Sequence, residues 1–197
     1  MARPGHGKKG NMMARRVVVT EFLSLDGVME APHEWHFDFW SDEMGTFKLD
    51  ELFASDALLL GRVTYEGFAA VWPTMTDEAG FADRINNLPK YVVSTTLTDP
   101  LAWNNSTLIT ENVAEEVAKL KQEPGQEIQV AGSGNLIQTL MRHDLVDEYR
   151  LMVHPVVVGS GQRLFAGDTG KTTLRLAKTT PLPNGVIVLS YEPQRSA

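Results

Sequence analysis

A regular alternation of short apolar runs with amphipathic segments is the feature that most constrains how this chain folds. Residues 15–23 (RRVVVTEFL) are rich in β-branched side chains, which suits a strand buried on both faces of a sheet. Further strands of this kind are expected at 56–61, 90–95, 106–110 and 127–132. Helical spacing of apolar residues is found at 42–54, 64–71, 112–122 and 135–142. Helices between consecutive strands imply crossovers, and crossovers imply parallel strands.

The pattern changes after residue 142. Three strand-like segments follow without a convincing helix between them, at 147–159, 172–182 and 185–193. We expect this tail to be antiparallel and to close one edge of the sheet. The sequence therefore predicts an α/β domain whose central sheet is mostly parallel.

Length, charge and the lack of cysteine narrow the class of protein. A chain of 197 residues suits one domain. Residues 1–12 carry three basic and no acidic side chains, so they read as a flexible extension, with a single domain at 13–197. The net charge of -7 makes nucleic acid an unfavourable partner, and no apolar stretch is long enough to cross a membrane. We expect a cytoplasmic protein. The absence of cysteine excludes disulfides and thiolate catalysis.

No metal site is expected. The run HEWH at 33–36 has histidines three positions apart beside Pro32, whereas the zinc-protease pattern needs histidines four apart on a helix.

A glycine-rich turn, AGSGNL, stands where a strand should end and a helix begin. The first amides of a helix have no internal partners, so an anion is stabilised there, and Gly132 and Gly134 would let the backbone approach a phosphate. Ser133 or Asn135 could cap the helix or donate to the anion. The alternative is a capped strand-to-helix corner without a ligand.

A second turn of similar type is LLLGRVTYEGF. Arg62 follows Gly61 at the end of a strand, and Thr64 stands at an expected N-cap. Two anion sites suit a dinucleotide, and an arginine favours NADP over NAD, although Arg62 could also be a solvated surface residue. A third strand, YVVST, ends in Ser94 and Thr95. Ligands of open α/β sheets bind outside the carboxyl ends of the strands, where all three sets lie.

Two further turns are candidates for the substrate side. Asp26, in SLDGVME, could donate a proton or form an Asx turn with Gly27. Gly159 and Gly161, in HPVVVGSGQRLF, could bring backbone amides near a ligand or connect a hairpin. The aromatic stretch 31–40, which contains Trp35, is either a loop packed over the core or a lid over a flat heterocycle.

In this order and spacing, VVVTEFLSLDG, LLLGRVTYEGF, YVVST, QVAGSGNLIQTLM and DEYRLMVHPVVVGSGQRLF resemble the dihydrofolate-reductase-like family. The closest likeness is to the reductase domain of riboflavin biosynthesis (RibD C-terminal domain) and its stand-alone relatives. The resemblance covers about Met13 to Pro193 and implies a three-layer fold of about eight strands with an antiparallel carboxyl-terminal strand. The paired cysteines of the deaminase half of bifunctional riboflavin enzymes are absent.

The resemblance also implies NADPH as hydride donor, a small heterocyclic substrate and a homodimer. By this likeness the cofactor is bound by Gly61, Arg62, Thr64, Ser94, Thr95, Gly132, Ser133, Gly134 and Asn135. The substrate side comprises Asp26, Gly27, Trp35, Gly159 and Gly161, with Asp26 as the expected proton donor and ordered water as its rival. A riboflavin-type reductase is the leading interpretation. The alternatives are a dihydrofolate or pterin reductase, if Asp42, Glu43 or Asp50 faces the cleft, and a non-catalytic dimeric NADP-binding protein.

Overall fold

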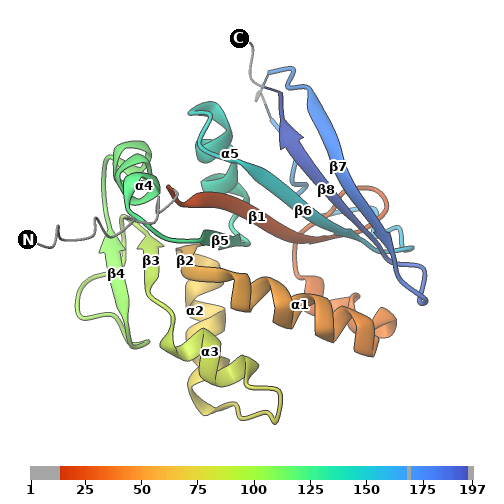
Figure 1. Cartoon of the computed structure of the whole chain (residues 1–197), viewed down its shortest axis with the longest axis horizontal. Coiled ribbons are helices and arrows are strands. Elements are labelled where there is room, and N and C mark those ends of the chain that lie inside the picture. The colour runs from red at the N-terminus through yellow and green to blue at the C-terminus, as the bar shows by residue number, and fades with distance from the viewer. Residues whose placement is uncertain (1–13, 168–169, 195–197) are drawn as a thin grey trace, which may run out of the picture.

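The computed structural model describes residues 14–167 and 170–194 (Figure 1). The expected extension at 1–12 lies outside these residues. Within them, none of the helices combines the length and the apolar character that crossing a membrane requires.

The core of the molecule is one eight-stranded sheet. In spatial order its strands are β4 (Ser106–Ile109), β3 (Lys90–Val93), β2 (Ser55–Gly61), β5 (Glu127–Ala131), β1 (Arg16–Leu23), β6 (Glu148–Val153), β8 (Ile187–Pro193) and β7 (Leu174–Pro181). The six strands from β4 to β6 are parallel, and β8 runs antiparallel to both of its neighbours. All six parallel strands therefore end at the same rim of the sheet.

Helices cover both faces of this sheet, giving three layers (Figure 1). One layer contains α4 (Val113–Gln122) and α5 (Gly134–Arg142), and the other contains α1 (Asp42–Ala54), α2 (Arg62–Val71) and α3 (Phe81–Asn87). Strand alternation explains this division, because Val17, Val19 and Leu23 of β1 pack in the same apolar cluster as α4 and α5. Leu58 and Leu60 of β2 point the other way, into the cluster of α2 and α3.

Most elements lie where the sequence predicts them, and α1 has the predicted bounds. The expected antiparallel tail is wrong for its first segment, because β6 pairs in parallel with β1. The reason is that α5 stands between β5 and β6 and acts as a crossover. Helix α2 begins at Arg62 with Gly61 as its N-cap residue, so Thr64 lies inside the first turn and is not the cap. Helix α3 was not predicted.

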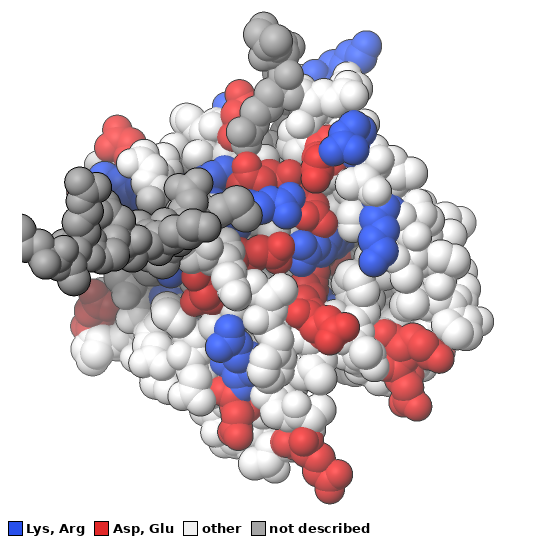
Figure 2. All heavy atoms as spheres, viewed as in Figure 1, with Lys and Arg blue, Asp and Glu red and all other residues white. Residues whose placement is uncertain are grey.

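Charged side chains of both signs gather on the sheet face that also carries α1 (Figure 2). Arg150 donates to Glu127 at 2.7 and 2.8 Å and to Glu148 at 2.8 Å. Arg16 donates to Glu148 at 3.0 Å. Since Thr20 pairs with Arg150 across β1 and β6, these groups lie on the same face as Thr20. Burial of Arg150, Glu127 and Glu148 is possible because each is paired with an opposite charge.

Lys90 is the most deeply buried charged residue described, with no exposed surface. Its Nζ donates to the carbonyl oxygens of Asn86, Leu88 and Asn104 at 2.7, 2.9 and 3.2 Å, and it lies 4.2 Å from the ring centroid of Trp103. The ammonium thus ties the end of α3 and the loop before β4 to the start of β3.

Lys90→Met should destabilise the fold, because the apolar stem is kept while three carbonyl groups, one of them buried and two partly buried, lose their donor. We expect a loss of about 2–4 kcal/mol in the free energy of unfolding, measured by urea denaturation. Lys178→Met, at an exposed position of β7, is the matched control and should change stability little. Equal stabilities of the two variants would show that the Lys90 ammonium is dispensable.

Candidate functional site

The candidate site lies at the rim where the parallel strands end. The turns after β3, β2, β5, β1 and β6 follow one another along this rim, in the spatial order of their strands. They carry all of the candidate residues except Trp35, which lies in the insert before α1.

The corners after β2 and β5 are in direct contact. Thr64 Oγ1 and Ser133 Oγ lie 3.1 Å apart. A Cβ atom on Gly61 would come within 2.2 Å of Ser133 Oγ, and one on Gly132 within 2.4 Å of Thr64 Oγ1. Gly132 also has a φ of 68°, which favours glycine. Glycine is therefore required at both positions for the two corners to meet.

Helix α5 starts at the second of these corners. Its N-cap residue, Ser133, makes no capping bond with its side chain, and the first intrahelical bond runs from Ile137 N to Ser133 O. The amides of Gly134, Asn135 and Leu136 consequently have no partner inside the helix, and the helix dipole adds positive potential there. The structure thus retains at α5 the features that a phosphate-binding turn needs, without the hydroxyl cap that the sequence allowed.

The remaining expected cofactor residues differ in exposure and in the hydrogen bonds that they make within the chain. Arg62 is exposed and donates to Glu66 at 2.8 Å. Asn135 and Thr95 are exposed. Ser94 is 7% exposed, and its hydroxyl accepts from the amides of Thr96 and Leu97 at 3.1 and 3.0 Å. The Ser94 hydroxyl therefore holds its own turn.

Glu21 of β1 was not singled out from the sequence. It is 8% exposed, and its Oε1 accepts from Gly132 N at 2.7 Å. One of the amides of the glycine-rich turn is therefore already occupied. Burial is the main influence on this carboxyl group and raises its pKa to about 8, whereas the Gly132 amide and the Lys48 charge act in the opposite direction. The only sequence signal for Glu21 is an acidic residue inside an apolar run.

Asp26 ties together two loops of the rim. Its carboxylate accepts from Ser24 Oγ at 2.7 Å and from the amides of Val158 and Gly159 at 3.1 and 3.0 Å. Arg163 donates to the backbone oxygen of Asp26 at 3.0 Å. These donors, the Ser24 hydroxyl first, lower the pKa of Asp26 to about 2. The expected proton-donor role needs a raised pKa, and the contacts have the opposite effect.

Three glycines lie in the two loops that the Asp26 carboxylate holds together, at 24–27 and 156–161; we call this arrangement the loop clamp. Gly27 and Gly159 have φ values of 82° and 86°, and a Cβ atom added to either would meet no other part of the chain within 4 Å. Gly161 has a φ of 120°, and a Cβ there would come within 2.9 Å of Val28 Cγ1. The positive φ thus explains why glycine stands at all three positions. At Gly161 the lack of a side chain also permits a close approach of the two loops.

The aromatic insert contains η1 (Pro32–Glu34) and η2 (Phe37–Phe39) and has both packed and exposed rings. Trp35 is 8% exposed and donates to Glu30 O at 3.2 Å, so its ring is packed. Phe37 and Trp40 are 63% and 48% exposed. If a flat ligand is covered by this insert, Phe37 and Trp40 are the rings available to cover it.

Two buried imidazoles lie close together, His36 of the insert and His154, which follows β6. His154 Nδ1 lies 3.2 and 3.0 Å from the carbonyl oxygens of Leu23 and Met152, so Nδ1 carries the proton and donates to them. His36 stacks on Phe22 with ring centroids 4.6 Å apart. Burial lowers the pKa of His154, and burial together with the neighbouring His154 lowers that of His36 to about 4. Both rings are therefore neutral at pH 7.

The three acids expected on α1 differ in burial from the acid that the helix does bury. Asp42, Glu43 and Asp50 are exposed. The buried acid of this helix is Glu51, whose Oε2 accepts from Thr20 Oγ1 at 2.8 Å and from Lys48 Nζ at 2.5 Å. The pterin-reductase alternative stays a prediction, and Glu51 is the acid of α1 that contacts β1.

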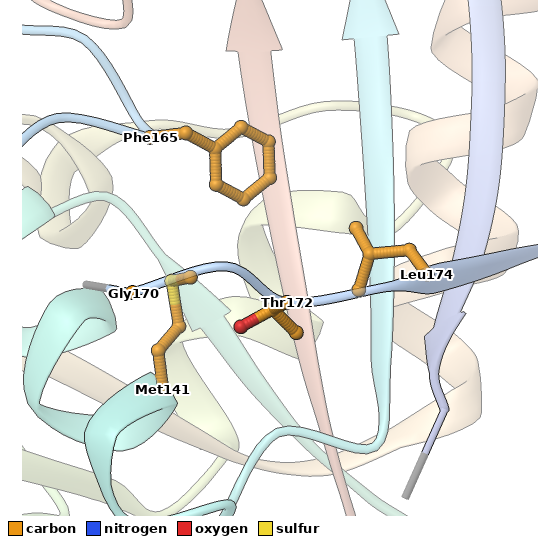
Figure 3. A pocket seen from close by; sticks show the side chains of 5 residues that line it. All are labelled: Met141, Phe165, Gly170, Thr172 and Leu174. Carbon is orange, nitrogen blue, oxygen red and sulfur yellow. The ribbon is translucent and has the colours of Figure 1, made fainter.

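A cavity of about 170 Å³ lies away from the rim. Met141, Phe165, Gly170, Thr172 and Leu174 line it, between the last turn of α5 and the start of β7 (Figure 3). Since α5 has nine residues, this cavity is about 12 Å from the N-terminal end of that helix. It is not part of the candidate site.

The layers, strand order and rim define a dihydrofolate-reductase-like α/β protein. The model of the RibD C-terminal domain family matches residues 15–188, and the chain belongs to that family. Two proteins of Bacillus subtilis are similar in sequence, the uncharacterised proteins YyaP and YwjB. YyaP is 32% identical over 92% of this chain and 96% of its own length. YwjB is 33% identical over 85% of this chain and 92% of its own length.

Solved structures show the same fold at lower identity. A putative riboflavin biosynthesis protein from Shewanella sp. has a TM-score of 0.73 at 21% identity, over 93% of this chain and all of that one. Dihydrofolate reductase from Enterococcus faecalis, complexed with NADP(H), has a TM-score of 0.63 at 12% identity, over 93% and 99% of the two chains. A deaminase/5-amino-6-(5-phosphoribosylamino)uracil reductase from Thermotoga maritima has a TM-score of 0.63 at 14% identity, over 92% and 57%.

Asp26→Asn should loosen the loop at 156–161, because the amide has one acceptor oxygen where the carboxylate has two. We expect the amides of Val158 and Gly159 to exchange hydrogen about tenfold faster than in the wild type, measured by NMR or mass spectrometry. Asp38→Asn, at an exposed position of η2, is the control. Unchanged exchange at both amides would contradict the role of the Asp26 carboxylate in holding the loop at 156–161.

Proposed function

We propose that this protein is an NADPH-dependent reductase of the riboflavin-biosynthesis type, which transfers hydride to a carbonyl or imine carbon of a small heterocycle-linked substrate. The leading candidate reaction is that of 5-amino-6-(5-phosphoribosylamino)uracil reductases. The observation that carries the proposal is the glycine-dependent contact of the corners after β2 and β5, which sets the uncapped start of α5 beside Thr64 in a chain of this family.

The residues present at the rim fit a phosphorylated dinucleotide. The free amides at the start of α5 would hold the pyrophosphate, and Ser133 packs against Gly61 beside them. Arg62 would meet the additional phosphate of NADPH by exchanging its partner Glu66 for the anion. Thr95 and Asn135 are exposed beside these groups and available for further contacts.

The substrate side would be formed by the loops that Asp26 clamps together. NADPH, when bound, supplies the hydride. Asp26 is ionised at neutral pH, so in this proposal its role is to orient the loops at 24–27 and 156–161, with Gly27 and Gly159 shaping their backbone. The proton needed by the reduced substrate would then come from ordered water. The exposed rings of Phe37 and Trp40 would cover a flat heterocycle and exclude bulk water.

We also propose that the chain acts in the cytoplasm as a homodimer. The support for the dimer is a group of ion pairs on β5, β1 and β6, where Figure 2 shows charges of both signs at the surface. Light scattering would report a mass of two chains.

Ligand-dependent thermal stability tests the proposal directly. NADPH should raise the melting temperature more than NADH or a flavin at equal concentration, because only preferential binding to the native state stabilises it, by about 2.7 kcal/mol at a hundredfold excess over Kd. Oxidation of NADPH with a panel of pyrimidine, pterin and other heterocyclic substrates then separates an enzyme from a non-catalytic NADP-binding protein. Preferential stabilisation by a flavin would overturn the cofactor assignment.

Arg62→Ala should weaken binding of NADPH about tenfold or more and leave NADH nearly unchanged, because NADH lacks the additional phosphate. Titration of cofactor fluorescence gives both dissociation constants. Arg142→Ala is the control, because Arg142 is the last residue of α5 and lies at the end of that helix away from the proposed pyrophosphate site. This variant also removes one positive charge and should affect neither cofactor. Equal losses for the two cofactors in Arg62→Ala would remove the argument for NADPH.

A further inference from the structure

Glu21 is an acid in apolar surroundings. It belongs to β1, and its neighbours on the same face of that strand, Val19 and Leu23, are part of the apolar cluster beneath α4 and α5. Glu21 forms no ion pair within the described residues. An unpaired carboxylate in such a position is strongly disfavoured, whereas a protonated carboxyl group is tolerated.

The charged groups around Glu21 do not neutralise it. On the opposite face of the sheet, Lys48 and Glu51 of α1 have opposing effects on it and are bonded to each other at 2.5 Å. Along the rim, Asp26 is paired with Arg163, and Glu30 accepts from Gln162 N at 2.7 Å. Strand β6 presents Leu151 beside Glu21, and the first turn of α5 carries no charged side chain.

The bond from Gly132 N to Glu21 Oε1, at 2.7 Å, connects this acid to the proposed pyrophosphate site. Gly132 directly precedes Ser133, the N-cap residue of α5, and the free amides of that helix start at Gly134. A negative charge on Glu21 would therefore compete with a bound anion for the positive potential of the same helix end.

We propose that Glu21 is a positioning residue of the pyrophosphate turn, which holds Gly132 as the protonated acid and must be uncharged for the anionic cofactor to bind. This inference rests on the proposed function, because it takes the cofactor to be NADPH. Anion binding and ionisation of Glu21 are then mutually exclusive. Cofactor binding at alkaline pH is accompanied by the uptake of one proton.

The direction of the pH effect follows from the raised pKa of Glu21, about 8. Below pH 7 the carboxyl group is protonated and the site is competent. Above pH 8 the competent fraction decreases, to about one tenth at pH 9, so the apparent affinity falls about tenfold there. The same shift makes the fold less stable as the pH rises from 4.5 to 8, because over this range the folded state holds a proton that the unfolded state releases.

The test is the dissociation constant of NADPH from pH 6.5 to 9.5, by isothermal calorimetry, for the wild type, Glu21→Gln and Glu78→Gln. Glu21→Gln keeps an acceptor for Gly132 N and cannot ionise, so its affinity should stay constant. The wild type and Glu78→Gln, whose exposed side chain lies in the loop before α3, should both weaken about tenfold between pH 7 and 9. Burial lowers the pKa of Lys90 to about 8, so Lys90 titrates in the same range in all three proteins. The role of Glu21 is therefore read from the difference between the pH profiles of Glu21→Gln and the other two.

A second measurement needs no variant. Calorimetry of the wild type at pH 8.5 in two buffers of different ionisation enthalpy should show proton uptake on binding. Parallel pH profiles of wild type and Glu21→Gln, or binding without proton uptake, would overturn the role of Glu21 while leaving the proposed function intact. Absence of NADPH binding by the wild type at every pH would instead overturn the proposed function, and this inference with it.

Discussion

The contact between the corners after β2 and β5 is the constraint on which the candidate site depends. Thr64 and Ser133 are 69 positions apart in the chain, yet their hydroxyl groups lie 3.1 Å from each other because β2 and β5 are neighbours in the sheet. The approach leaves no room for a side chain at Gly61 or Gly132. A parallel sheet brings two helix starts to one rim, and these glycines let them meet there.

The distribution of charge gives the two faces of the sheet different characters. On the face that carries α1, arginines and glutamates are paired, so their burial is compensated. On the face that carries α5, Glu21 has an amide partner and forms no ion pair with any residue that the structure describes. Because no described cation forms an ion pair with it, burial favours the protonated form of Glu21. The protonation state of Glu21 is thereby linked to the binding of an anion at the start of α5.

The rim thus combines groups whose protonation states at neutral pH are set by their contacts. Asp26 is ionised because the Ser24 hydroxyl and two amides donate to its carboxylate, whereas Glu21 is protonated because it is buried. His36 and His154 are neutral for the same reason of burial. In the proposed reductase the Asp26 carboxylate would be charged and these three groups uncharged, so water would deliver the proton to the reduced substrate.

The sequence by itself determined the mostly parallel α/β fold, the bounds of α1, the glycine corners at the rim and membership of the dihydrofolate-reductase-like family. These features depend on residues close together in the chain, whose spacing and backbone preferences can be read directly. Only the tertiary structure decided the ionisation of Asp26, the engagement of the Ser94 hydroxyl and the position of Glu21 behind the glycine-rich turn. Asp26 meets Val158 across 132 positions and Glu21 meets Gly132 across 111. Burial and hydrogen bonding between such distant residues set a pKa, and no local pattern encodes them.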